Sequence, residues 1–148
     1  MEITPEDIDA AVRTLYGECR GEPMAGKVAV AWVILNRARI RKQSLTRVCK
    51  APWQFSCWNE NDPNRRKLEA LKETDAGYIE CLRALDTAMD GKGGDPTYGS
   101  QHYHTVGLRP LPTWALGHDV VCVIGNHCFY VGIDGPHRES VHKMQTGE

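Results

Sequence analysis

The segment YGECRGEP, residues 16–23, places two glutamates around the end of a helical pattern. Glu18 follows Ala11 by seven residues and Leu15 by three, so it leaves the helix on or beside the apolar face. At this position, burial and the negative end of the helix dipole both favour a protonated carboxyl group. A carboxyl that keeps its proton near neutral pH can act as the general acid at a glycosidic oxygen. A solvated helix end is the structural alternative, and Glu22, before Pro23, is expected to form a salt bridge or cap the next helix.

A second catalytic carboxylate is harder to find. Glycosidases usually pair two carboxylates, the second acting as nucleophile or as base for water. The other acidic candidates lie in polar loops or at strand starts, and no spacing connects them to Glu18; they are Glu60, Asp62, Asp95 and Asp119. The sequence therefore also fits a one-carboxylate enzyme. In such an enzyme the sugar's own 6-hydroxyl or acetamido group captures the oxocarbenium-like intermediate, and Glu18 serves as acid and then as base.

Two helices position this segment. Thr4 can cap the first helix, Pro5 suits its first position, and its apolar face carries Ile8, Ala11, Val12 and Leu15. Pro23 opens a second helix that extends to Ile40 and is apolar almost all round over its middle. Such a helix is expected to be buried at the centre of the domain.

The remaining elements complete an α+β architecture. Residues 45–62 form an irregular, aromatic-rich segment, a third helix is expected over about 64–89 with a possible break near Gly77, and residues 90–99 form a loop. SQHYHTVG and DVVCVIGNHCFYVG are predicted to form two short strands. We therefore expect a mainly helical domain with a small antiparallel sheet over residues 1–134, followed by a polar tail over 135–148.

Composition restricts the class of protein. A chain of 148 residues with 41% hydrophobic and 25% charged residues has the size and mix of one globular domain. A net charge of -1 provides no field that would attract nucleic acid or anionic lipid. The longest apolar run, residues 28–35, is far shorter than the roughly 20 residues needed to span a bilayer. The acidic N-terminus lacks a signal-peptide pattern, so we expect synthesis in the cytoplasm with reduced thiols.

The histidines and cysteines raise a metal-binding alternative. His102, His104, His127 and Cys128 could supply zinc ligands, and the same residues resemble a His-Asn-His nuclease pattern. However, there is no C-x-x-C pair and no H-E-x-x-H helix, and the weak net charge argues against a nuclease. We therefore expect no metal and no cofactor. Pairing of Cys49 with Cys57, or of Cys122 with Cys128, stays open beside buried reduced thiols.

Five ordered motifs resemble those of the SleB-type cell-wall hydrolases, a family that includes spore cortex-lytic enzymes and phage or prophage lysins. They are LYGECRGEPMAGKVAVAWVILNR, WQFSCWN, DPTYGSQHYH, P-x-W at residues 112–114, and IGNHCFY, and they span about residues 10–131. The resemblance implies a lysozyme-like α+β fold and cleavage of the MurNAc-GlcNAc bond of peptidoglycan. In the better-known members this is a lytic transglycosylase reaction that leaves a 1,6-anhydro end. It also implies that Glu18, the first glutamate of G-E-x-R-G-E, is catalytic.

The same resemblance implies residues that bind the sugar. The Q-F-S turn and the two strand motifs provide them, namely Gln54, Phe55, Ser56, His102, Tyr103, His104, His127 and Tyr130. Strand alternation places His102 and His104 opposite Tyr103, and His127 opposite Tyr130, so only one set can line the groove. Trp53 and Trp58 could stack on sugars or pack in the core.

The interpretation is a monomeric peptidoglycan glycosidase with Glu18 as acid/base, whose partner is a peptidoglycan glycan strand. We expect no nucleic acid partner and no stable membrane insertion. Many spore-lytic relatives have an exported precursor and a binding domain. The lack of both features favours a phage or prophage endolysin that reaches the bacterial cell wall after release. The alternatives are a zinc-dependent N-acetylmuramoyl amidase and a non-catalytic phage component that binds the wall.

Overall fold

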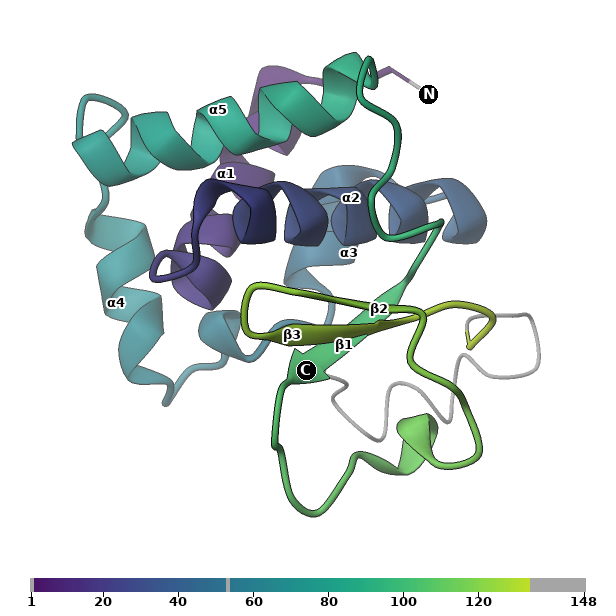
Figure 1. Ribbon diagram of the computed structural model, residues 1–148. Coiled ribbons are helices and arrows are strands. Elements are labelled where there is room, and N and C mark those ends of the chain that lie inside the picture. The colour runs from purple at the N-terminus through teal and green to yellow at the C-terminus, as the bar shows by residue number, and fades with distance from the viewer. Residues whose placement is uncertain (1, 53, 134–148) are drawn as a thin grey trace.

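The computed structural model describes residues 2–52 and 54–133, and these form a helical layer packed on a small sheet (Figure 1). The helices and 3-10 turns are α1 (Pro5–Cys19), α2 (Met24–Arg41), α3 (Leu45–Lys50), η1 (Ser56–Trp58), α4 (Pro63–Ala70), α5 (Ala76–Asp90) and η2 (Thr113–Ala115). The strands are β1 (His102–Thr105), β2 (Cys122–Ile124) and β3 (His127–Tyr130). The expected mainly helical α+β class is confirmed, whereas the boundary at 134 and the tail fall outside the described residues.

Helix α1 begins as expected, with a reciprocal cap. The Thr4 hydroxyl accepts from the Asp7 N–H and the Asp7 carboxylate accepts from the Thr4 N–H, both at 3.1 Å. The second Asp7 oxygen accepts from the backbone N–H and the hydroxyl of Thr46, at 3.0 and 2.6 Å. Asp7 thus joins the start of α1 to α3, and the apolar face of α1 is held against the core.

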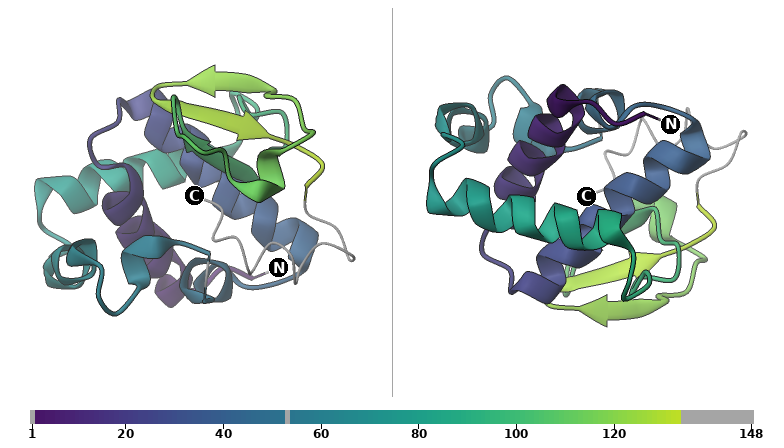
Figure 2. Two further views of the ribbon diagram at one scale, coloured as in Figure 1. Left: turned by 90° about the horizontal axis from the view of Figure 1, so that it is seen from below. Right: turned by 90° about the horizontal axis from the view of Figure 1, so that it is seen from above.

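Helix α2 is the central element. It begins at Met24 after its N-cap residue Pro23, as expected, and it ends at Arg41, one residue beyond the expected end. Seen from below, the sheet covers α2; seen from above, α5 crosses it (Figure 2). Its fully enclosed apolar residues are Ala29, Val30, Ala31, Val33 and Ile34. The expected central burial of this helix is confirmed.

Two stretches differ from the sequence-based expectation. Residues 45–62 contain the short helix α3 and the 3-10 turn η1, so this segment is less irregular than expected. The third expected helix is two helices, α4 and α5, separated by residues 71–75. A long-range contact favours this break, because the Arg13 guanidinium donates to the carbonyl oxygens of Leu68 and Leu71, at 2.7 and 2.6 Å. These carbonyls at the end of α4 are satisfied without a further helical turn.

The sheet has the strand order β1-β3-β2, and both pairings are antiparallel. The second expected strand is a hairpin, because the chain turns back between Ile124 and His127. Tyr103 lies opposite Phe129, and Phe129 opposite Cys122, on the face that packs against the helices. The other face carries a second apolar cluster made of Trp114, Ala115, Tyr130 and Ile133, with Cys128 against it.

None of the six cysteines forms a disulfide. Cys122 and Cys128 lie on opposite faces of the β2–β3 pair, since Cys122 is opposite Phe129 and Cys128 is opposite Val123. The structure therefore has the reduced-thiol alternative rather than either disulfide. Within residues 2–52 and 54–133, no helix combines the length and the apolar character required to cross a membrane.

Candidate functional site

Glu18 lies at the penultimate position of α1, in an open groove of about 420 Å³. The groove is formed by the end of α1, the following turn, the start of α4 and the sheet; its lining residues are Gly17, Glu18, Cys19, Arg20, Gly21, Glu22, Asn64, Thr105 and His127. The expectation that Glu18 leaves the helix beside the buried face is confirmed, because its side chain is only partly exposed and contacts interior groups.

Two donors hold the Glu18 carboxyl group. The Tyr103 hydroxyl donates to Glu18 Oε1 at 3.1 Å, and the Cys57 backbone N–H donates to Oε2 at 3.3 Å. Gly17 makes the second contact possible. A Cβ at Gly17 would lie 2.7 Å from Cys57 Cβ and 2.8 Å from Leu68 Cδ2, so a larger residue would push η1 away from α1.

Burial raises the pKa of the Glu18 carboxyl above its ordinary value. Hydrogen bonds from Cys57 and Tyr103 and the positive charge of Arg37 act in the opposite direction, but burial has the larger effect. The result is a carboxyl group that keeps its proton at higher pH than a solvated glutamate and yet has partners that stabilise its anion. This combination suits a group that donates a proton and later takes one back.

Arg37 acts on the site from the interior of the protein, because its charge lowers the pKa of Glu18 although its side chain is 0% exposed. Its Nε donates to the Gln101 carbonyl oxygen at 2.6 Å, and its guanidinium lies 4.7 Å from the centre of the Phe55 ring. The sequence signal of its burial was its spacing, four residues after Val33 and seven after Val30, on the buried stripe of α2.

Tyr103 and His127 share the sheet face that points towards Glu18. Their rings meet edge to face, with centroids 4.8 Å apart. His127 is 6% exposed, and burial lowers its pKa more than the negative charge of Glu22 raises it. Its imidazole is therefore mainly neutral at neutral pH. Strand alternation left two candidate sets, and the geometry brings the Tyr103 and His127 set to Glu18.

The opposite face holds the other predicted strand residues. His104 Nε2 and the Tyr130 hydroxyl are hydrogen-bonded at 2.8 Å, and the Trp114 ring packs against His102, His104 and Tyr130. All three predicted residues are at most 3% exposed. The structure therefore does not bring His102, His104 or Tyr130 to Glu18; they form the core of the second cluster.

The Q-F-S turn lies beside Glu18, but two of its side chains point inward. Gln54 and Phe55 are each 1% exposed. The Arg41 guanidinium donates a hydrogen bond to the Gln54 amide oxygen, and the Arg37 guanidinium stacks over the Phe55 ring. Ser56 is exposed at the start of η1. Of the three, only Ser56 has an exposed side chain, whereas Gln54 and Phe55 support the turn that carries Cys57 to Glu18.

Trp58 follows this turn and packs towards the helices. Trp58 is partly buried against the main core, and its indole N–H donates to the Thr14 hydroxyl at 2.8 Å. This contact belongs to core packing. Trp53 lies outside the described residues.

Of the two roles expected for Glu22, a salt bridge or a cap of α2, the capping role is wrong. It does not cap α2, whose N-cap residue Pro23 has no side-chain hydrogen bond. Instead, Glu22 Oε1 accepts from the Asn126 N–H at 2.7 Å and lies 3.8 Å from His127 Nδ1. Glu22 therefore connects the chain after α1 to the tip of the β2–β3 hairpin, and it lines the same groove as Glu18.

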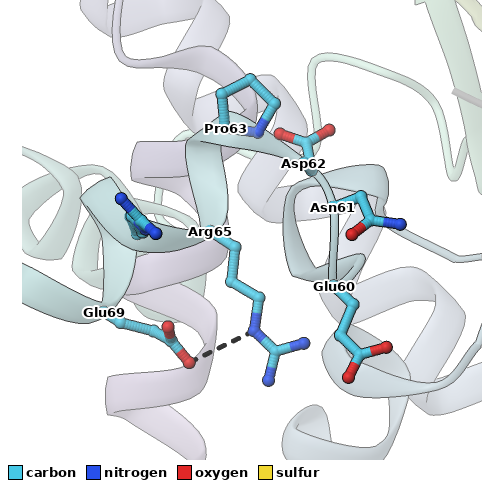
Figure 3. Close-up of a pocket in the computed structure, with 7 residues that line it drawn as sticks. Glu60, Asn61, Asp62, Pro63, Arg65 and Glu69 are labelled. Atoms are coloured by element: carbon cyan, nitrogen blue, oxygen red, sulfur yellow. Dashed lines mark hydrogen bonds and ion pairs between the residues drawn. The ribbon is translucent and has the colours of Figure 1, made fainter.

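The other acidic candidates lie outside this groove. Glu60 and Asp62 line a separate surface pocket of about 520 Å³, where Arg65 forms a 3.3 Å ion pair with Glu69 (Figure 3). Asp62 also caps α4 by accepting from the Asn64 N–H at 2.8 Å. None of the four acidic candidates, Glu60, Asp62, Asp95 and Asp119, lines the groove of Glu18.

The four side chains considered as zinc ligands do not come together on one face of the sheet. His127 faces the helices, whereas His104 and Cys128 face the second cluster across the same sheet. Among the residues that the structure describes, no three histidine, cysteine, aspartate or glutamate side chains are placed to hold a metal ion.

Comparison with known proteins assigns this architecture to a family. A family profile described as Cell Wall Hydrolase matches residues 21–130. The chain belongs to the cell wall hydrolase family. The matched range covers the sheet, the Q-F-S turn and Glu22, and it begins three residues after Glu18. The resemblance to SleB-type enzymes is thereby confirmed.

The similar proteins in this family are spore enzymes. The chain is 30% identical over 125 residues to the spore cortex-lytic enzyme of Bacillus subtilis (strain 168), covering 83% of this chain and 37% of that protein. It is 34% identical over 96 residues to the spore cortex-lytic enzyme of Oceanobacillus iheyensis, covering 57% of this chain and 35% of that protein. The chain thus spans a little over a third of the length of these relatives.

Two solved structures share the fold. The catalytic domain of the Bacillus cereus SleB protein superposes with a TM-score of 0.68 at 27% identity, covering 87% of this chain and 92% of that one. The catalytic domain of the germination-specific lytic transglycosylase SleB from Bacillus anthracis also superposes with a TM-score of 0.68 at 27% identity, covering 86% of this chain and 95% of that one. The expected lysozyme-like fold is confirmed.

Proposed function

We propose that this cell wall hydrolase is a lytic transglycosylase that cleaves the MurNAc-GlcNAc bond of peptidoglycan, with Glu18 as general acid and base. The observation that carries the proposal is the Glu18 carboxyl group, which lies in an open groove, accepts hydrogen bonds from Tyr103 and Cys57, and has its pKa raised by burial. The family and the activity named for the Bacillus anthracis SleB domain support it.

The groove residues account for a two-step reaction. Protonated Glu18 gives its proton to the glycosidic oxygen, and the bond from that oxygen to the anomeric carbon breaks, with the electron pair leaving on oxygen. The Tyr103 hydroxyl and the Cys57 N–H then stabilise the Glu18 carboxylate beside the oxocarbenium-like sugar. The 6-hydroxyl of the same sugar attacks the anomeric carbon and gives its proton to Glu18. The step consumes no water and restores the acid.

The geometry narrows the residues proposed to contact the sugar. Tyr103 and His127 share the sheet face beside the acid, and Ser56 is exposed on the neighbouring turn. Gln54 and Phe55 support that turn, whereas the set made of His102, His104 and Tyr130 stabilises the far side of the sheet. We therefore assign direct substrate contact to Ser56 and to His127, which lines the groove, whereas Tyr103, at 2% exposed, holds the Glu18 carboxyl group.

Incorporation of labelled oxygen tests the reaction type. Digestion of purified peptidoglycan in water enriched in ¹⁸O places the label at each new reducing end if a water molecule attacks. A transglycosylase forms the 1,6-anhydro ring and incorporates none. Label in the products would identify a muramidase and would require a group that activates water.

The zinc-dependent amidase is a rival that makes a different prediction. An amidase cuts the stem peptide from the sugar and normally needs a metal ion, so a chelator would abolish its activity. The proposed glycosidase keeps its activity after dialysis against EDTA, and its products keep their peptides. A non-catalytic protein that binds the wall would release no fragments at all.

Two further expectations concern the biological setting of the enzyme and its oligomeric state. A phage or prophage endolysin was expected from the sequence, but the similar proteins are spore cortex-lytic enzymes and give that setting no support. Comparison of activity on vegetative wall and on spore cortex separates the two settings. Light scattering in solution tests the expected monomer.

A further inference from the structure

Glu22 is the second carboxylate of the groove, and its contacts are directed at the β2–β3 hairpin. Its Oε1 accepts from the Asn126 N–H at 2.7 Å, while the side chain is 15% exposed. A hydrogen bond from a backbone N–H to a partly buried carboxylate is among the stronger ones in proteins. The link joins residues that are 104 positions apart in sequence, so it fixes the hairpin tip relative to the end of α1.

The hairpin tip is shaped around this carboxylate. Gly125 adopts φ +58°, a left-handed conformation that favours glycine. A Cβ at this position would overlap Glu22 Oε1, so any side chain here would displace the carboxylate or the turn. Glycine at 125 thus serves the close approach of Glu22 as well as the turn itself.

The fixed tip leads directly to the catalytic carboxyl group. His127 follows Asn126, and its ring packs edge to face on Tyr103 at 4.8 Å. The Tyr103 hydroxyl in turn donates to Glu18 Oε1 at 3.1 Å. We propose that Glu22 is a positioning residue, which anchors the hairpin so that His127 holds Tyr103 on Glu18. The proposal rests on the function proposed for Glu18.

Two substitutions of Glu22 separate positioning from catalysis. Glutamine keeps an oxygen that accepts from the Asn126 N–H but cannot ionise, whereas alanine removes the acceptor. A positioning role predicts a kcat for Glu22→Gln within about threefold of wild type, and for Glu22→Ala a kcat at least about tenfold lower, in line with the loss of one charge-assisted hydrogen bond. Glu60→Ala, in the separate pocket of Figure 3, is the matched control and keeps wild-type kcat.

The pH profile gives a readout that a general loss of stability would not change. The Tyr103 hydrogen bond lowers the pKa of Glu18, so loosening it raises that pKa further. The activity of Glu22→Ala should therefore extend to higher pH than that of wild type. Gly125→Ala, which displaces the same contact from the other side, should show the same profile.

The outcomes decide between the two roles. If Glu22→Gln loses as much activity as Glu22→Ala, the charge itself is required and Glu22 is a catalytic carboxylate, which overturns the positioning role. Wild-type kcat in Glu22→Ala would also overturn it. Amide NMR provides a test without substrate, because Glu22→Ala should shift the Tyr103 signal, whereas Glu22→Gln should change only the signals next to the substitution and at Asn126. If wild type releases nothing from peptidoglycan, the proposed function fails, and the NMR comparison still tests the anchor.

Discussion

Replacement of Tyr103 by phenylalanine removes one hydroxyl group from the candidate site. That hydroxyl donates to Glu18 Oε1 at 3.1 Å, and Tyr103 is 2% exposed, so little else should change. A hydrogen bond to a charged group is worth about 1.5–3 kcal/mol and one to a neutral group about 0.5–1.5 kcal/mol. The difference, about 1–1.5 kcal/mol, is lost as Glu18 becomes a carboxylate in the transition state. It corresponds to an approximately tenfold lower kcat.

The assay is the release of soluble fragments from purified peptidoglycan between pH 4 and 9. Loss of the Tyr103 hydrogen bond raises the pKa of Glu18, so the alkaline limb of the profile should move to higher pH while the maximum falls. Tyr130→Phe is the matched control, because this hydroxyl bonds His104 on the opposite face of the sheet. Equal effects of the two substitutions, or an unchanged rate and profile in Tyr103→Phe, would refute the reasoning.

Three further predictions concern stability and can be checked by thermal or denaturant unfolding. Because burial raises the folded-state pKa of Glu18, its contribution to stability is present below the ordinary value of 4.5 and is lost as the pH rises through the folded value. Glu18→Gln should therefore raise the melting temperature at pH 7 but not at pH 4, and a lower melting temperature at pH 7 would contradict this. Burial acts to raise the pKa of Asp7, but hydrogen bonds from Thr46 and Thr4 leave it lowered, so its contribution is present above 3.8 and is lost as the pH falls through the folded value. Asp7→Ala should lower the free energy of unfolding by about 2 kcal/mol at pH 7 and by less near pH 2. An equal loss at the two pH values would contradict a stabilising role of the ionised Asp7 carboxylate. Gly17→Ala should cost about 1–3 kcal/mol through overlap with the Cys57 and Leu68 side chains, whereas Gly21→Ala, with nothing within 4 Å of its Cβ, should be nearly neutral.

Local signals in the sequence were sufficient for the first two helices and for Glu18. Thr4, Pro5 and Pro23 are strong markers of helix starts, and the spacing from Ala11 and Leu15 placed Glu18 beside the core. These inferences depend on residues within a few turns of one another. The break between α4 and α5 was expected only roughly, near Gly77, because its position depends on Arg13, more than 50 positions away from the carbonyl groups that it binds.

The surroundings of Glu18 were harder to predict for the same reason. Alternation showed that His102 and Tyr103 must face opposite ways, but only the strand order and the helix packing decide which face meets Glu18. Glu22 was assigned to the nearest helix start because its actual partner, the Asn126 N–H, is distant in sequence. Gln54 and Phe55 matched a binding motif, and their burial under Arg41 and Arg37 appears only in three dimensions.

Mass spectrometry of the fragments released from purified peptidoglycan by the wild-type chain and by Glu18→Gln tests the central claim most directly. A matched variant at Glu60, outside the groove, controls for changes in surface charge. We predict 1,6-anhydro muropeptides from wild type and from the Glu60→Gln variant, and none from Glu18→Gln. Anhydro products from Glu18→Gln at the wild-type rate would contradict the assignment of Glu18 as the acid and base.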